Sequence, residues 1–262
     1  MPRWARPEPR GRCEVLRVEN LVVRYGHGSK TVVAVDDVSI AVDAASIVGL
    51  VGESGSGKST LARAVVGLAP ISAGRVSWNG LEFDPTSRAR RDLARRPLQY
   101  IFQDPYASLD PRMSIGTSVA EGLGGRRRGR AARVGELLEL VRLDPGDATK
   151  LPRQLSGGQR QRVAIARALA SDPQILIADE ITSALDVSVQ GAVLNLLKEI
   201  QAETGVGILF ISHNLAVVRY MAQTISVMKS GKLVEHGTTD EVIERPSHPY
   251  TQELLAAVPR LV

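Results

Sequence analysis

The sequence has little cysteine, few aromatic residues and no long hydrophobic run. Its single cysteine, Cys13, excludes an internal disulfide and any zinc or iron–sulfur site built from several cysteines. Aromatic residues make up only 4% of the chain, which argues against a surface that stacks nucleic-acid bases. No stretch approaches about 18 uninterrupted apolar residues, so no transmembrane helix is predicted. The arginine- and proline-containing start has no apolar segment, so no secretory signal is predicted.

The remaining composition, 44% hydrophobic and 23% charged, is typical of a soluble globular protein. The 262 residues suffice for one large domain, or for a core domain that carries a smaller subdomain. The net charge of +5 comes from two arginine-rich segments, residues 1–12 and 126–133. We interpret them as a tail and a solvated helix face, with an anionic lipid surface or another acidic partner as the alternative. Residues 1–13 are predicted to form a basic disordered tail.

Buried strands alternate with helices along most of the chain. Residues 15–42 read as short alternating strands, and residues 108–170 as a mainly helical, more polar region. Helical patterns from Lys58 to about Leu68 and from Val189 to about Glu203 separate continuous apolar runs. These runs, typical of strands buried on both faces, are residues 46–51, 98–102, 175–178 and 207–211. The alternation predicts an α/β fold with a parallel sheet, which binds ligands beyond the carboxyl ends of its strands.

A glycine-rich segment follows the first of these buried strands. Residues 52–59, Gly-Glu-Ser-Gly-Ser-Gly-Lys-Ser, match the pattern G-x-x-x-x-G-K-[ST]. The glycines let the backbone turn its N–H groups inward to phosphate oxygens, and the following helix start adds attraction for anions. Lys58 is expected to reach the β and γ phosphates of ATP, and Ser59 to bind Mg²⁺. The predicted ATP-binding residues of this segment are Gly52, Glu53, Ser54, Gly55, Ser56, Gly57, Lys58, Ser59 and Thr60.

Two carboxylates end another predicted strand. Asp179 follows residues 175–178, where a Walker B aspartate would hold Mg²⁺ directly or through water. Glu180 comes next, and a carboxylate beside the metal can orient or deprotonate the attacking water. Glu180 is therefore the candidate catalytic base, and Ser59 and Asp179 are candidate metal ligands.

A second glycine-containing motif indicates which class of nucleotide-binding protein this is. It comprises Leu155, Ser156, Gly157, Gly158 and Gln159, and it resembles the signature motif of ATP-binding cassette (ABC) ATPases. Ser156 and the amides of the two glycines are expected to open a helix that runs from about Gln159 to Ala170. The resemblance implies that this helix start faces the γ-phosphate held by another subunit, so that a dimer is required. It also implies a P-loop NTPase fold, an ABC-type nucleotide-binding domain with a parallel-sheet core, an N-terminal antiparallel β-subdomain and a helical subdomain at about 108–171.

Further residues match other elements of the family, in order along residues 14–258. By resemblance, Tyr25 stacks on adenine, and Gln103 contacts Mg²⁺ and links the site to a membrane partner. His213, after the strand 207–211, resembles the switch histidine that touches the γ-phosphate. The interface loop known as the D-loop corresponds to Ser183, Ala184, Leu185 and Asp186.

The sequence departs from the family pattern at two places. Many relatives have proline after the catalytic glutamate, where this chain has Ile181, and this change is expected to loosen the turn. Relatives often have Gly-Glu before the strand that precedes the glycine-rich segment, where this chain has Ala45 and Ser46. Neither change removes a catalytic group, so ATP hydrolysis is predicted.

Two stretches, residues 102–113 and 248–259, resemble the peptide/nickel importer branch, with oligopeptide and dipeptide uptake ATPases nearest. The resemblance implies an ATP-hydrolysing subunit that powers solute import. It would be a peripheral protein at the cytoplasmic face of the cell membrane. Its implied partners are two transmembrane permeases, a second ABC ATPase (a paralogue or a copy of itself) and, indirectly, an extracytoplasmic solute-binding protein. Residues 259–262 are expected to be a short C-terminal end.

Other functions stay open at this stage. Nickel or metal-chelate import, and import of opine or sugar-like solutes, fit the same branch. A non-transport ABC ATPase acting on nucleic acid or ribosomes is a rival class, supported only by the two arginine-rich segments. Against it, the sequence has no coiled-coil heptad insertion and no zinc-binding cysteine cluster. An exporter ATPase is disfavoured by the two branch-specific stretches.

Overall fold

The structure is a computed structural model that describes residues 14–26, 28–83, 98–104, 108–124 and 129–257. Five predicted features therefore lie wholly or partly outside the described residues. These are the tail at 1–13, the end at 259–262, residues 105–107 of the first branch-specific stretch, residues 258–259 of the second, and residues 126–128 of the second arginine-rich segment.

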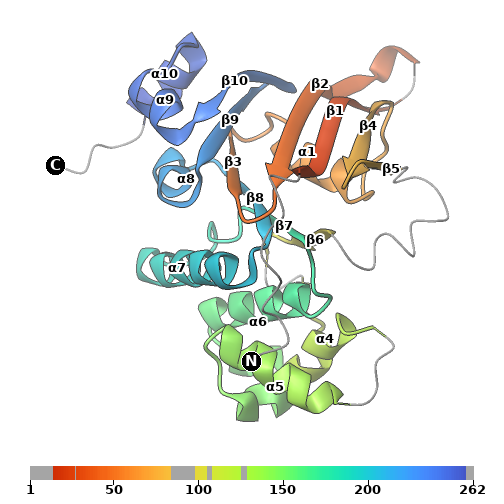
Figure 1. The fold of residues 1–262 in the computed structure, drawn as a ribbon, viewed down its shortest axis with the longest axis vertical. Coiled ribbons are helices and arrows are strands. Elements are labelled where there is room, and N and C mark those ends of the chain that lie inside the picture. Colours follow the sequence, from red (N-terminus) through yellow and green to blue (C-terminus); the bar gives the residue numbers. More distant parts are fainter. Residues whose placement is uncertain (1–13, 27, 84–97, 105–107, 125–128, 258–262) are drawn as a thin grey trace.

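A six-stranded sheet with the order β10-β9-β3-β8-β7-β6 forms the centre of the molecule (Figure 1). Its strands are β3 (Ile47–Val51), β6 (Leu98–Ile101), β7 (Ile175–Asp179), β8 (Gly207–Ser212), β9 (Thr224–Lys229) and β10 (Lys232–Thr238). Five strands are parallel: the four predicted ones, β3, β6, β7 and β8, and β9, which was not predicted. The edge strand β10 is antiparallel to β9, because Ser230 and Gly231 have φ of 47° and 85° and close a tight hairpin.

A second, antiparallel sheet has the order β2-β1-β4-β5. Its strands are β1 (Glu14–Tyr25), β2 (Val32–Asp43), β4 (Ala73–Trp78) and β5 (Leu81–Phe83). The short strands predicted over residues 15–42 merge into two long ones that pair with register shifts. Helix α1 (Lys58–Val65) shares one hydrophobic cluster with strands of both sheets, so it fills the space between them.

The predicted helical subdomain lies at the end of the molecule opposite the antiparallel sheet (Figure 1). It contains α4 (Ile115–Glu121), α5 (Arg130–Leu140), α6 (Gly157–Leu169) and two 3₁₀ turns, η2 (Pro145–Thr149) and η3 (Pro152–Gln154). In the sequence it is inserted between β6 and β7. Its apolar side chains join the cluster that covers the opposite face of the central sheet.

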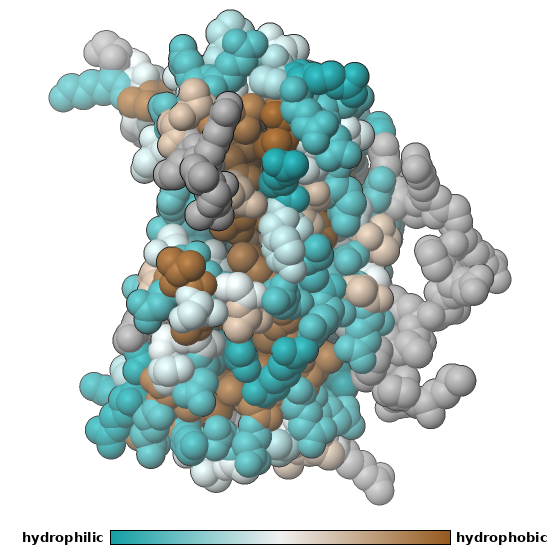
Figure 2. Space-filling view, turned by 90° about the vertical axis from the view of Figure 1, so that its left-hand side faces the viewer, coloured by the Kyte–Doolittle hydropathy of each residue, from teal (hydrophilic) through white to brown (hydrophobic). Residues whose placement is uncertain are grey.

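Four helices complete the described fold after β7. They are α7 (Val187–Thr204), α8 (Leu215–Met221), α9 (Thr239–Glu244) and α10 (Pro249–Ala256). Figure 2 shows the molecule from the side that carries them in Figure 1, with apolar patches between largely hydrophilic surroundings. Within the ranges that the structure describes, no helix is both long and apolar enough to cross a membrane.

Leu68 and Phe102 lie outside the helix and the strand that the sequence predicted to contain them. The helix after the glycine-rich segment ends at Val65, not at Leu68, because Gly67 has a φ of 74° and turns the chain out of the helix. Leu68 is then 61% exposed. Strand β6 ends at Ile101, and Phe102 lies beyond it with 44% of its surface exposed.

Candidate active site

The carboxyl ends of the central strands lie level with one another. Val51 of β3 pairs with Ser212 of β8, and Asp179 of β7 pairs with Ile211. Strand β6 is next in the sheet, where Ile101 pairs with Ala178. The residues that follow these strands, which include the predicted glycine-rich segment and its candidate partners, therefore meet at one edge of the sheet.

The glycine-rich loop, residues 52–57, depends on glycine at its two ends. Gly52 has a φ of 153°, and a Cβ built there would lie 2.1 Å from the carbonyl oxygen of Met228. Gly57 has a φ of 107°, and its Cβ would lie 2.3 Å from the carbonyl oxygen of Ala34. Both distances are too short for any side chain, so the loop fits its surroundings only with glycine at these positions.

Lys58 lies inside this loop. It is 4% exposed, and its Nζ donates hydrogen bonds to the carbonyl oxygens of Gly52 at 2.8 Å and Glu53 at 2.7 Å. Burial lowers the pKa of Lys58 below its ordinary value, while the negative charges of Glu180, Asp179 and Glu53 oppose this shift. The ammonium group is thus preorganised beside carboxylates, where it can meet the negative charge of a phosphate.

Asp179 is held from two sides. Its side chain is buried, and Oδ1 accepts a hydrogen bond of 3.1 Å from the Ser59 hydroxyl. Oδ2 accepts a short hydrogen bond from the hydroxyl of Tyr100 on β6. Burial, with the hydrogen bond to Asp179, raises the pKa of Tyr100, so the hydroxyl stays protonated and remains a donor.

Tyr100 was not predicted as a site residue. The sequence offered one signal, because a tyrosine within a buried strand needs a hydrogen-bond partner for its hydroxyl. Its partner is 79 residues away, so the contact could not be identified before the strands were placed side by side.

Glu180 lies between two other predicted site residues. Its Oε2 accepts a hydrogen bond of 3.0 Å from Nε2 of Gln103, and its Oε1 lies 3.3 Å from Nδ1 of His213. The Glu180 side chain is 15% exposed and that of His213 is 56% exposed, so the group faces the surface. Glu180 itself has a φ of 47°, a strained conformation that its amide stabilises by donating to Ile211 at 2.9 Å.

The turn after Glu180 is closed, whereas the replacement of proline by Ile181 was expected to loosen it. The amide and hydroxyl of Ser183 both donate to the carbonyl oxygen of Glu180, at 3.1 and 2.9 Å. Ile181 is 1% exposed and packs in the core. The isoleucine side chain therefore stabilises the turn by its burial in the core, whereas a proline would restrict the turn through its fixed φ.

The signature segment caps α6. The Ser156 hydroxyl accepts from the amide of Gln159 at 3.3 Å, and the Ser156 amide donates to Oε1 of Gln159 at 2.9 Å. This reciprocal pair starts the helix at Gly157, two residues earlier than predicted. A Cβ on Gly158 would lie 2.4 Å from Cγ1 of Val189, so glycine also permits the close approach of α7.

The predicted D-loop residues lie against the same segment. They form the turn before α7, in which the Leu185 amide donates a hydrogen bond of 3.1 Å to the carbonyl oxygen of Thr182. Asp186 occupies the N-cap position of α7. A Cβ on Gly157 would lie 3.3 Å from Cδ2 of Leu185. The signature segment and the D-loop therefore form one contiguous surface.

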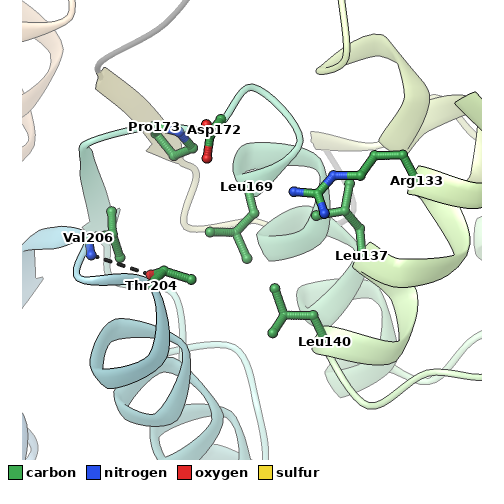
Figure 3. Close-up of a pocket in the computed structure, with 8 residues that line it drawn as sticks. All are labelled: Arg133, Leu137, Leu140, Leu169, Asp172, Pro173, Thr204 and Val206. Atoms are coloured by element: carbon green, nitrogen blue, oxygen red, sulfur yellow. Dashed lines mark hydrogen bonds between the residues drawn. The ribbon is translucent and has the colours of Figure 1, made fainter. Parts of the chain in front are cut away.

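Two further features lie away from this sheet edge. Tyr25, the predicted adenine-stacking residue, ends β1 of the antiparallel sheet, pairs with Val32 and is 41% exposed. A small pocket lies between α5, the end of α6 and the turn before β8 (Figure 3). None of its lining residues is a predicted site residue; they are Arg133, Leu137, Leu140, Leu169, Asp172, Pro173, Thr204 and Val206.

Comparison with known protein families gives two matches. The family described as ABC transporter matches residues 35–183. The family described as oligopeptide/dipeptide transporter, C-terminal region, matches residues 234–262.

Among curated proteins, the chain is 48% identical over 256 residues to the glutathione import ATP-binding protein GsiA of Escherichia coli strain K12. The same identity holds for GsiA of Shigella flexneri. The alignment covers 94% of this chain and 41% of the relative, so the chain spans less than half the length of the curated relatives that it matches.

Two solved structures show the same fold. One is a dimeric, post-hydrolysis state of the ATP-binding cassette MJ0796 bound to ADP and Pi, with a TM-score of 0.77 and 29% identity over 86% of this chain and 98% of that one. The other is cbiO1 from Clostridium perfringens, part of the ABC transporter complex cbiONQ, with a TM-score of 0.79 and 29% identity over 88% of this chain and 91% of that one. The chain therefore belongs to the ABC transporter family of ATP-binding proteins.

Proposed function

We propose that this chain is an ATP-hydrolysing subunit that powers the import of oligopeptides or dipeptides. The observation that carries the proposal is the match of residues 234–262 to the C-terminal region of oligopeptide/dipeptide transporters. The 48% identity to a glutathione import ATP-binding protein supports the same solute class, because glutathione is a tripeptide.

The glycine-rich loop is the site that we assign to the ATP phosphates. Lys58 meets the β and γ phosphates, and the amides at the start of α1 donate to phosphate oxygens. The other predicted ATP-binding residues, from Gly52 to Thr60, are assigned to the walls of the same phosphate-binding site. Tyr25 is assigned to adenine, and its exposed ring supports this role.

The residues present fit a Mg²⁺ ion. The Ser59 hydroxyl and the Asp179 carboxylate, 3.1 Å apart, are oxygen donors of the kind that Mg²⁺ prefers, and Gln103 lies beside them on the same sheet edge. When bound, the ion neutralises charge on the β and γ phosphates. Tyr100 keeps the second carboxylate oxygen of Asp179 in a fixed orientation.

Glu180 is the group that we assign to water activation. A water beside its carboxylate would be oriented for in-line attack on the γ-phosphorus and would lose a proton to Oε1 or Oε2, while the bond from the γ-phosphorus to the β–γ bridging oxygen breaks and ADP leaves. Gln103 and His213 contact this carboxylate through its two oxygens, and we assign both to the surroundings of the γ-phosphate.

The signature segment is assigned to the ATP held by a second cassette, identical or paralogous. Its capped helix start offers the amides of Gly157 and Gly158 to an anion. The adjoining D-loop, Ser183 to Asp186, would lie at the same interface, which the dimeric state of MJ0796 supports. Two ATP molecules between two head-to-tail subunits would then close the dimer.

Two transmembrane permeases are the proposed membrane partners, with an extracytoplasmic solute-binding protein acting through them. Residues 102–113, a stretch that includes Gln103, are assigned as the segment that docks the permease on the cytoplasmic side. Phe102, 44% exposed beside the site, supports this assignment. Movement at Gln103 would link nucleotide state to the permease.

Glu180→Gln is expected to retain MgATP binding and to lower kcat for ATP hydrolysis at least about 100-fold, because the amide cannot accept the proton of water. Steady-state hydrolysis and nucleotide affinity measure the two effects. Glu199→Gln, which changes an exposed glutamate paired with Arg142, is the control and should retain activity. Near-normal turnover in Glu180→Gln would contradict the assigned role.

Tyr100→Phe removes the hydroxyl that holds Oδ2 of Asp179. The Mg²⁺ concentration for half-maximal ATP hydrolysis should rise about three- to tenfold, because the carboxylate loses one of its two orienting hydrogen bonds. A Mg²⁺ titration of hydrolysis at saturating ATP measures this change. An unchanged Mg²⁺ dependence would show that the hydroxyl does not support the metal site.

Affinity capture from gently solubilised native membranes, followed by mass spectrometry, tests the transport function. We expect two polytopic permeases, with or without a second ATPase and a solute-binding protein. Recovery from the soluble fraction with nucleic acid or ribosomes, and without a permease, would overturn transport and leave the ATPase chemistry intact.

A further inference from the structure

The C-terminal helix α10 contacts the glycine-rich loop through one tyrosine. The hydroxyl of Tyr250 accepts a hydrogen bond of 3.0 Å from the backbone N–H of Glu53, 197 residues away in the sequence. Tyr250 is 2% exposed and belongs to the core cluster on one face of the central sheet. The contact is therefore a partly buried tertiary hydrogen bond, whose loss would leave a loop amide without this partner.

The turn before α10 determines where Tyr250 lies. The Glu235 carboxylate on β10 accepts a hydrogen bond from the amide of His248 at 3.1 Å. His248 in turn caps the helix, because its Nδ1 accepts from the amide of Tyr250 at 3.1 Å, and Pro249 occupies the first helical position. Nζ of Lys229 lies 4.3 Å from the centroid of the Tyr250 ring.

Glu235 remains charged in this arrangement. Burial opposes its ionisation, but the hydrogen bonds that it accepts from the turn outweigh that effect and hold the pKa of the carboxyl below its ordinary value. The turn is thus anchored by a carboxylate at neutral pH.

The N–H group that Tyr250 holds belongs to the same peptide group as the carbonyl of Gly52. That carbonyl accepts the 2.8 Å hydrogen bond from Nζ of Lys58. The peptide is trans, and in a trans peptide the N–H and C=O groups point in opposite directions. Tyr250 and Lys58 therefore hold opposite sides of one planar group.

Gly52 is where this peptide group could otherwise turn. Its φ of 153° lies in a region that glycine enters without strain, and the contact with Met228 excludes a side chain there. The local chain thus places little restraint on the orientation of the Gly52–Glu53 peptide. The hydroxyl of Tyr250 supplies a restraint on its N–H side.

We propose that Tyr250 is a positioning residue for Lys58: its hydroxyl locks the orientation of the Gly52–Glu53 peptide and so holds the carbonyl that places the Lys58 ammonium. The inference rests on the proposed function, in which this loop binds MgATP. Because coupling between two sites is reciprocal, bound nucleotide stabilises the docking of α10 on the loop. The C-terminal region thereby contributes to the nucleotide site.

Tyr250→Phe tests the proposal in the full chain, because it removes the hydroxyl and leaves the ring over Lys229. In the nucleotide-free protein, hydrogen exchange at the Glu53 amide should become faster. The Kd for MgATP, measured by isothermal titration calorimetry, should rise about three- to tenfold, as expected for the loss of one hydrogen bond.

Tyr220→Phe is the matched control. The Tyr220 hydroxyl donates a hydrogen bond to Asn195, and Nζ of Lys198 lies 4.3 Å from its ring centroid, so Tyr220 shares with Tyr250 a hydroxyl hydrogen bond and a lysine beside the ring. Tyr220 lies on α8 and is half exposed, and its contacts with Asn195 and Lys198 lie on α7, away from the glycine-rich loop. Exchange at Glu53 and the Kd for MgATP should be unchanged in this variant.

The two measurements separate this inference from the proposed function. Wild-type protein that binds no MgATP would overturn the proposed function and the inference with it. Wild-type binding with an unchanged Kd in Tyr250→Phe would overturn the inference alone. A Tyr250→Phe variant with a lower melting temperature, but with unchanged Glu53 exchange and Kd below that temperature, would show a purely structural role and would also overturn it.

Discussion

Parallel pairing among β3, β7 and β8 is the constraint on which the site depends. It sets the ends of these strands level, so that the glycine-rich loop, the Asp179–Glu180 pair and His213 emerge at one edge. Each strand is buried over its whole length, and a shift in register would disrupt the packing of side chains on both faces as well as separate these groups. Hydrophobic burial therefore determines the geometry of a polar site.

Much of this arrangement could be predicted from the sequence. Continuous apolar runs identified the central strands, and the motifs that follow them identified the groups at the sheet edge. The β4–β5 and β9–β10 hairpins were missed, although Asn79-Gly80 and Ser230-Gly231 are typical turn pairs. The strands of these hairpins are only three to seven residues long and carry weak periodic signals, and pairing with neighbouring strands decides whether they form.

Tyr100 and Tyr250 could not be identified as site residues for a different reason. Each acts through a hydroxyl whose partner is distant in the sequence, at Asp179 and at the amide of Glu53. Neither tyrosine belongs to a sequence motif with a known role in nucleotide binding, and a tyrosine in an apolar segment is ordinarily a packing residue. The same holds for Ile181, whose contribution to the turn comes from burial that only the folded chain provides.

Binding of MgATP by Lys58→Met, compared with wild type by isothermal titration calorimetry, tests the central claim most directly. Methionine keeps the aliphatic volume of the buried side chain but removes the ammonium, and Lys198→Met serves as the exposed control. If the strand edge binds the phosphates, the affinity of Lys58→Met should fall at least about tenfold while the control is unchanged. Equal affinity in a folded Lys58→Met protein would contradict this assignment of the nucleotide site.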